Sequence, residues 1–191
     1  MIAVISDANI IIDLLHLTLF EDFLRLSWEK HVPPGVVDEV REEDSSLLID
    51  AINAGQLSMP AFDFEDLQQI QKYFEQYPPL SVADCSCLHL AERLPAILLT
   101  GEKRLRSIAS GTHAIKVHGT LWVLDNLIKE NIINYRKVHA KLNDLMQINP
   151  RLPKAECQKR LKRWKKKIEP SHDTIKPLVR KIRIKAQNQN T

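Results

Sequence analysis

Short apolar runs alternate along the chain with longer stretches in which apolar residues recur every three or four positions. The runs IAVIS (residues 2–6) and AILL (residues 96–99) are almost wholly apolar, as expected for strands buried on both faces. Weaker runs at residues 31–32 and 114–117 predict two more strands. The three-to-four spacing predicts amphipathic helices beginning near residues 8, 18, 36, 64, 81, 102, 120 and 134. This alternation indicates an α/β fold with a mostly parallel central sheet.

The apolar spacing also predicts which face of each helix is buried. In a single helix over residues 36–54, the expected inner residues are Val36, Val40, Leu47 and Ala51. In the helix capped by Asp63 they are Leu67, Ile70 and Phe74, and in the helix opened by Ser81 they are Val82, Cys85 and Leu88. Thr18 and Glu21 have the spacing of a capping box at the start of another helix.

The pattern changes after Pro150, which divides the chain into a domain over residues 1–149 and an extension over residues 150–191. Within the extension, a basic helix is expected at about residues 154–168. Leu161 and Trp164 lie on its apolar side. The segment past Pro170 is polar and is expected to be loosely ordered.

Charge separates the two parts more sharply than the net charge of +3 suggests. Residues 1–150 hold 13 Lys and Arg against 21 Asp and Glu, whereas residues 151–191 hold 14 against 3. Lys162, Arg163 and Lys166 are candidates for binding nucleic-acid phosphates, because basic helices contact the phosphate backbone. The alternative is that the helix only docks on the domain and keeps its lysines in solvent. A third option places the basic tail over the acidic residues of the domain.

Several classes of protein are disfavoured. No stretch approaches the roughly 20 apolar residues of a membrane span, so no membrane partner is expected. The N-terminus lacks the basic segment of a signal peptide, which makes a cytoplasmic location the default. Three cysteines without an export signal argue against a disulfide framework. Cys85 and Cys87 are expected to be buried thiols rather than zinc ligands.

Four acidic residues lie near predicted strand ends or helix starts. Asp7 follows the first strand, Glu102 follows the strand at residues 96–99 by three residues, and Asp84 and Glu39 lie in the first turns of helices. Each has a structural explanation: Asp7 and Glu102 suit helix N-termini, Asp84 completes a near capping box with Ser81, and Glu39 belongs to a charged helix face. The carboxyl ends of parallel strands, however, form one crevice, where these residues would meet.

Carboxylates gathered in one pocket repel one another and would recruit a cation. Oxygen ligands without thiolate or imidazole suit Mg²⁺ or Mn²⁺. Such a site activates water and stabilises the leaving oxygen in phosphoryl displacement. The chain has no glycine-rich phosphate loop and no GxSxG or HExxH motif. A haloacid-dehalogenase phosphatase would need a second acid at Asn9, and a receiver domain would need a partnered lysine for which Lys103 is a weak candidate.

The ordered segments ISDANIIIDLL, VVDEVREE, LSVADCSCLHLAERL, LLTGEKRLR and HGTLWVLDNLI resemble those of prokaryotic PIN-domain nucleases, including VapC-like toxins. The resemblance implies a Rossmann-like three-layer sandwich and metal-dependent RNA cleavage. Asp7, Glu39 and Asp84 match the acidic triad, and Glu102 matches a fourth acid that is commonly Asp. With Mg²⁺ or Mn²⁺ expected as cofactor, the implied metal ligands are Asp7, Asp84 and Glu102.

Asn9 and Thr100 are candidates for hydrogen bonding to those ligands. The resemblance also implies RNA as substrate, a homodimer and an antitoxin protein as partner. The alternative function is a nucleic-acid-binding or regulatory module on the same scaffold, with weak or no nuclease activity.

Overall fold

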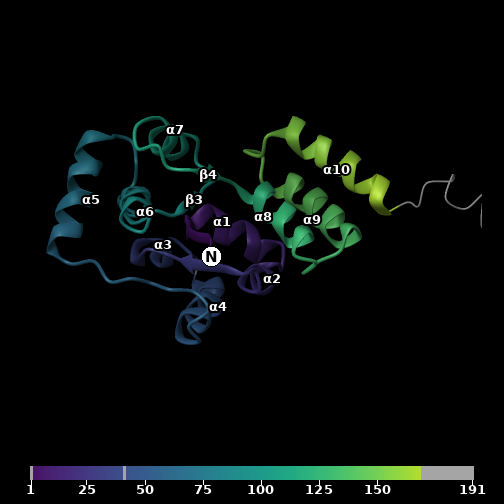
Figure 1. Cartoon of the computed structure of the whole chain (residues 1–191), viewed down its shortest axis with the longest axis horizontal. Coiled ribbons are helices and arrows are strands. Elements are labelled where there is room, and N and C mark those ends of the chain that lie inside the picture. The colour runs from purple at the N-terminus through teal and green to yellow at the C-terminus, as the bar shows by residue number, and fades with distance from the viewer. Residues whose placement is uncertain (1, 41, 169–191) are drawn as a thin grey trace, which may run out of the picture.

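A computed structural model describes residues 2–40 and 42–168 of the chain. Four strands form one parallel sheet, with the order β2-β1-β3-β4. Their bounds are β1 Ile2–Ser6, β2 Trp28–His31, β3 Ile97–Leu99 and β4 Val117–His118. Helices cover both sides of this sheet, which confirms the predicted α/β three-layer fold (Figure 1). The segment past Pro170, expected to be loosely ordered, lies outside the described residues.

Ten helices are described along residues 2–40 and 42–168. Their bounds are α1 Ala8–His16, α2 Phe20–Leu24, α3 Pro34–Glu39, α4 Glu42–Asn53, α5 Phe64–Gln76, α6 Val82–Arg93, α7 Lys103–Gly111, α8 Thr120–Lys129, α9 Tyr135–Ile148 and α10 Lys154–Ile168. Helix α6 packs against β1 and β3, while α7 and α8 pack against β4. Among the described residues, no helix is both long enough and apolar enough to cross a membrane.

The single helix predicted over residues 36–54 is wrong, because the chain breaks it into α3 and α4. Val40 ends α3 with an extended backbone (ψ 131°) and is buried. An extended backbone conformation costs a β-branched residue little free energy. It lets the Val40 side chain reach the core at the point where the chain changes direction. The predicted inner position Leu47 is 47% exposed, and its neighbour Leu48 is fully buried instead.

The predicted capping box of Thr18 and Glu21 is also wrong. Thr18 adopts a positive φ of 52° outside the helix, and α2 begins only at Phe20. The Thr18 hydroxyl donates to the Leu17 carbonyl instead of capping. The turn nevertheless buries Leu19 and Phe23.

Helix α5 leaves apolar side chains in solvent, against the prediction from its spacing. Ile70 is buried as predicted, and Tyr73 is buried beside it. Leu67 and Phe74 are 54% and 42% exposed, and Phe64 is more exposed still. Figure 1 places α5 at one edge of the molecule, where α6 is its described helical neighbour. Only one side of α5 is therefore covered.

Helix α6 buries Cys85 and Leu88 as predicted, but Val82 is 55% exposed at its first position. Cys85, Cys87 and Cys157 are free, buried thiols. Burial, followed by the negative charges of Asp7, Asp84 and Glu39, raises the pKa of Cys87 well above its ordinary value. Cys87 is therefore a protonated core residue beneath the acidic residues.

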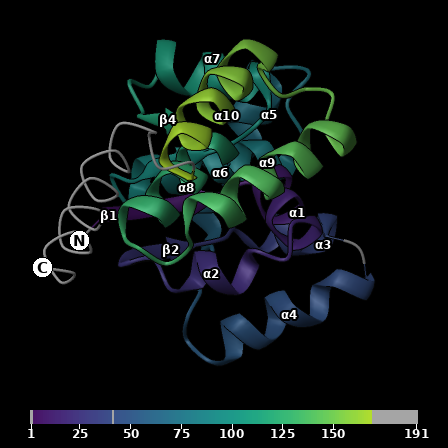
Figure 2. The ribbon, with the colours of Figure 1, turned by 90° about the vertical axis from the view of Figure 1, so that its right-hand side faces the viewer.

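Helix α10 of the extension docks on α9, as Figure 2 shows. Its buried face consists of Cys157, Leu161 and Trp164, and Trp164 is only 1% exposed. Arg160 and Arg163 both pair with Asp125 of α8. Helix α10 therefore docks on the domain, as one of the predicted alternatives has it. Lys162 and Lys166 remain exposed on this helix.

Candidate active site

The carboxyl ends of β1 and β3 bring Asp7 and Thr100 together. The Asp7 amide donates to the Leu99 carbonyl at 3.0 Å, directly where the two strands end. Both Asp7 and Thr100 are buried, with exposed fractions of 1% and 0%. Residues 93 positions apart are therefore fixed side by side by the parallel register Ser6–Leu99.

The Asp7 carboxylate is held by two neutral donors. Its Oδ2 accepts from Thr100 Oγ1 at 2.6 Å and from Asn9 Nδ2 at 2.9 Å. Asp7 occupies the cap position of α1, yet its side chain makes no capping hydrogen bond to that helix. Burial raises the pKa of Asp7 despite these two hydrogen bonds, and the charge of Asp84 raises it further. Burial of a carboxylate is costly, and a cation bound beside it would offset that cost.

Asp84 enters from the first turn of α6. Ser81 and Asp84 form a reciprocal capping box: the Asp84 amide donates to Ser81 Oγ at 3.0 Å, and the Ser81 amide donates to Asp84 Oδ2 at 2.9 Å. This confirms the capping geometry suggested by the sequence. The same carboxylate is half-buried and close enough to raise the pKa of Asp7, so capping and site formation coexist.

Glu39 is the last residue of α3, which ends at the extended Val40, and it lines the same cavity as Asp7. Partial burial raises the pKa of Glu39, the charges of Asp7 and Asp84 raise it further, and a hydrogen bond with Ser81 opposes them. Three acids from different segments therefore repel one another electrostatically.

Glu102 is held differently from the other three acids. It caps α7 by accepting from the Arg104 amide at 3.2 Å, and its own amide donates to Thr100 Oγ1 at 2.9 Å. Its Oε2 lies 3.9 Å from Arg151 Nη1, a loose ion pair with the extension. Thr100 thus contacts both Asp7 and Glu102, and it orients the two strand-end acids.

All four predicted acids line one cavity of about 320 Å³. The residues lining it are Asp7, Asn9, Glu39, Pro79, Leu80, Ser81, Asp84, Glu102 and Arg104. Thr100 lies behind Asp7 rather than on the wall. We call this space the acidic cavity.

The donors of the acidic cavity fit Mg²⁺ or Mn²⁺ by their chemistry, since they are carboxylate oxygens without thiolate or imidazole. Within the described part of the chain, however, no three His, Cys, Asp or Glu side chains are grouped closely enough to hold one ion. Asp84 and Glu102 are instead hydrogen bonded to the first turns of their own helices.

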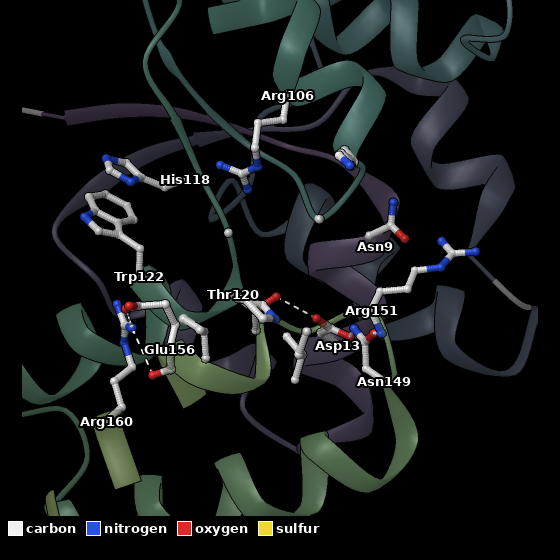
Figure 3. Close-up of a pocket in the computed structure, with 16 residues that line it drawn as sticks. Asn9, Asp13, Arg106, His118, Thr120, Trp122, Asn149, Arg151, Glu156 and Arg160 are labelled. Carbon is white, nitrogen blue, oxygen red and sulfur yellow. Dashed lines mark hydrogen bonds and ion pairs between the residues drawn. The ribbon is translucent and has the colours of Figure 1, made fainter. Parts of the chain in front are cut away.

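A second cavity of about 580 Å³ adjoins the first, and both include Asn9 in their walls (Figure 3). Its wall is shared between the domain, including Arg106, His118 and Trp122, and the extension, including Arg151 and Arg160. We call it the basic cavity. Sequence reasoning missed it, although the LLTGEKRLR and HGTLWVLDNLI segments contain half of its lining residues.

Lys162 and Lys166 are exposed on α10, as predicted, whereas Arg163 pairs with Asp125 and lies over Trp164. None of these three residues lines the acidic cavity or the basic cavity. Their role in binding nucleic acid stays a prediction.

Comparison with known proteins gives one match that covers most of the chain. A family model described as a PIN domain matches residues 3–166, which includes β1 except for Ile2, strands β2 to β4, and nearly all of α10. No curated protein matches the sequence.

Proposed function

We propose that this chain, which belongs to the PIN-domain family, is a divalent-metal-dependent endoribonuclease that hydrolyses RNA phosphodiester bonds. Proteins with this domain are generally nucleases. The observation that carries the proposal is the acidic cavity, in which the charge of Asp84 raises the pKa of Asp7, the charges of Asp7 and Asp84 raise the pKa of Glu39, and Glu102 lines the same wall.

Each acid has a proposed role. Asp7, Asp84 and Glu102 would hold the metal ion, and Glu39 would act as a base toward the attacking water. When bound, Mg²⁺ or Mn²⁺ would supply a more acidic water and neutralise charge on the phosphate. Thr100 and Asn9 fix the Asp7 carboxylate through the hydrogen bonds described above, so they would act by positioning.

The direct test is cleavage of a labelled pool of mixed RNA sequences in Mn²⁺ or Mg²⁺. We expect Asp7→Asn to lower the rate at least about 100-fold, because removal of one charged ligand weakens both metal binding and transition-state stabilisation. EDTA should abolish cleavage by the parent protein.

Asp50→Asn is the matched control, since Asp50 is exposed on α4 and remote from the cavity lining. It should cleave at the parental rate. Equal rates for the parent and for Asp7→Asn, both proteins being folded, would refute the nuclease proposal.

A second candidate is an RNA-binding or regulatory module without effective cleavage. It is favoured by the arrangement of Glu102, which caps α7 and faces Arg151, and by the lack of a closed three-ligand group among the described residues. This candidate predicts salt-dependent RNA binding and no cleavage in either metal.

The toxin role is a narrower proposal that rests on the resemblance to VapC-like proteins. Expression of the parent protein should then arrest bacterial growth, and Asp7→Asn should not. A cognate antitoxin would relieve the arrest. Homodimer formation is proposed on the same resemblance, and sedimentation analysis would measure it.

A further inference from the structure

We infer that the basic cavity is a subsite for one unpaired RNA nucleotide adjacent to the phosphate that is cleaved. The inference rests on the proposed function, because it deepens the RNA-binding side of the same site. The cavity opens beside the acidic cavity: Asn9 lines both, and Gly101 of one wall precedes Glu102 of the other. An RNA strand whose phosphate lies at the carboxylates of the acidic cavity therefore places its next nucleotide in the basic cavity.

The volume suits this occupant. About 580 Å³ lies within the range of sites that take a nucleotide-sized ligand. A base pair within a duplex would not enter, since the cavity lies between the body of the domain and the extension. Single-stranded RNA presents bases that can leave the stack and enter such pockets.

Aromatic rings form one wall. His118 stacks on Trp122 with centroids 4.3 Å apart and planes at 5°, and Trp122 stacks in turn on the buried Trp28 at 4.7 Å. Burial, then the positive charges of Arg106 and Lys116, lower the pKa of His118, so its ring is neutral at pH 7. Neutral aromatic rings that are held in place by stacking on one another can also stack on a nucleobase.

Four basic residues, Lys103, Arg106, Arg151 and Arg160, line the cavity against two acidic ones, Asp13 and Glu156. Arg106 lines the cavity and donates to the carbonyl oxygens of Thr100 and Val117 (2.5 Å and 3.4 Å), so its guanidinium is held by backbone carbonyl groups rather than by a carboxylate. A Cβ at Gly119 would lie 3.2 Å from Arg106 Nη2, so a side chain there would crowd this guanidinium. Lys103 and Arg151 are exposed at the border with the acidic cavity. These cations offset the repulsion that four acids exert on a phosphate.

The test is binding of a fluorescent eight-nucleotide RNA in EDTA, where divalent ions are absent and cleavage does not interfere. A series of RNAs, each lacking the base at one position, locates the subsite. We expect one position at which loss of the base weakens binding about tenfold, the size of one stacking contact. In His118→Ala this penalty should shrink to within about twofold, because part of the ring wall is gone.

Charge is tested separately at the surface, where folding is not at risk. Lys103→Glu should weaken binding of the intact RNA about tenfold, whereas Lys72→Glu, on the exposed side of α5, should leave it unchanged. A duplex of the same sequence should compete poorly. Thermal melts establish that each variant is folded.

The inference is overturned if the parent does not bind the RNA, if no position is sensitive to base loss, or if Lys103→Glu binds like Lys72→Glu. Binding that follows the expected pattern without any cleavage in Mn²⁺ or Mg²⁺ would support the subsite and refute the nuclease. Cleavage with unchanged binding by Lys103→Glu would support the nuclease and refute the subsite.

Discussion

Asp7 is buried between two strand ends, where the folded protein disfavours its negative charge. A carboxyl group whose pKa is raised by folding binds its proton more tightly in the folded state than in the unfolded state. The folded protein therefore loses stability as the pH rises through the pKa of this group, and that loss persists at neutral pH. The negative charge of Asp7 therefore lowers the stability of the fold at neutral pH.

Replacement of this charge should stabilise the metal-free protein. We expect Asp7→Asn to raise the free energy of unfolding by roughly 1 kcal/mol at pH 7, because burial and the charge of Asp84 no longer act on a carboxylate. Urea denaturation in EDTA measures this change. The gain should vanish well below pH 3.8, the ordinary pKa of the group, where Asp7 is protonated in both states.

Asp50→Asn, on exposed α4, is again the control and should change stability little. A marked loss of stability in Asp7→Asn would mean that the hydrogen bonds from Thr100 and Asn9 outweigh the burial of charge.

The order of acids along the sequence was enough to locate the acidic cavity, because parallel strands end at one edge. Their bonding was not predictable. The sequence offered two alternatives for Asp84, a helix-capping residue or a residue of the acidic site. In the structure Asp84 both caps α6 and lines the acidic cavity. Arg106 was missed because its partners are backbone carbonyl groups, which carry no sequence signal.

At the scale of elements, one acidic residue of α5 pairs with two basic residues of α6 and holds the two helices together. Asp66 Oδ1 accepts from His89 Nε2 at 2.6 Å, and Oδ2 pairs with Arg93, whose guanidinium lies over Phe62. The hydrogen bond from His89 is the main cause that lowers the pKa of Asp66. These contacts explain why α5 is held although much of its apolar surface is exposed.

The junction should weaken in acid. Because folding lowers the pKa of Asp66, its contribution is fully present above the ordinary value of 3.8 and is lost as the pH falls through the lower folded value. Asp66→Asn should reduce the melting temperature at pH 7 by about 2–4 °C, the shift expected for roughly 1 kcal/mol in a chain of this size. Calorimetry from pH 7 to 2.5 measures both effects.

Glu65→Gln, on the exposed side of the same helical turn, is the matched control and should melt like the parent. If Asp66→Asn shows the same acid-induced decline as the parent, the decline arises elsewhere.

Helices and strands were largely predictable in kind and order, because apolar spacing reflects burial on a repeating geometry. The predictions were wrong where the buried residues do not follow a regular helical spacing. Leu67 and Phe74 are spaced as inner residues but face solvent, since Ile70 and Tyr73 already fill the contact with α6. Val40 is spaced as a helical residue but is extended, because its burial requires a turn in the chain.

At the scale of the whole molecule, the extension completes the basic cavity and also exposes a separate row of lysines. Docking of Leu161 and Trp164 against α9 sets the rotation of α10, which directs Lys162 and Lys166 outward. The charge difference between the domain and the extension was readable from sequence. The shared cavity was not, because it depends on how α10 is seated.

The outward lysines should add affinity without sequence preference. We expect a double variant, Lys162→Ala with Lys166→Ala, to reduce the slope of log affinity against log salt by roughly 1–1.5, as for two phosphate contacts to a single strand. Stability should be unchanged, because both side chains are exposed. Titrations of single-stranded RNA at several salt concentrations measure the slope.

Lys72→Ala, on α5, serves as the control for nonspecific loss of charge. An unaltered slope in the double variant would assign α10 a purely structural role.

The sheet has narrow, protected borders. Strand β4 contributes only two residues at one border, and at the other the Ser58 segment already bonds to Lys30 and Val32 around the end of β2. Few backbone groups remain for another copy to extend the sheet, so fibril growth by strand addition is disfavoured. Concentrated samples should therefore self-associate, if at all, as helix-mediated species that dilution reverses.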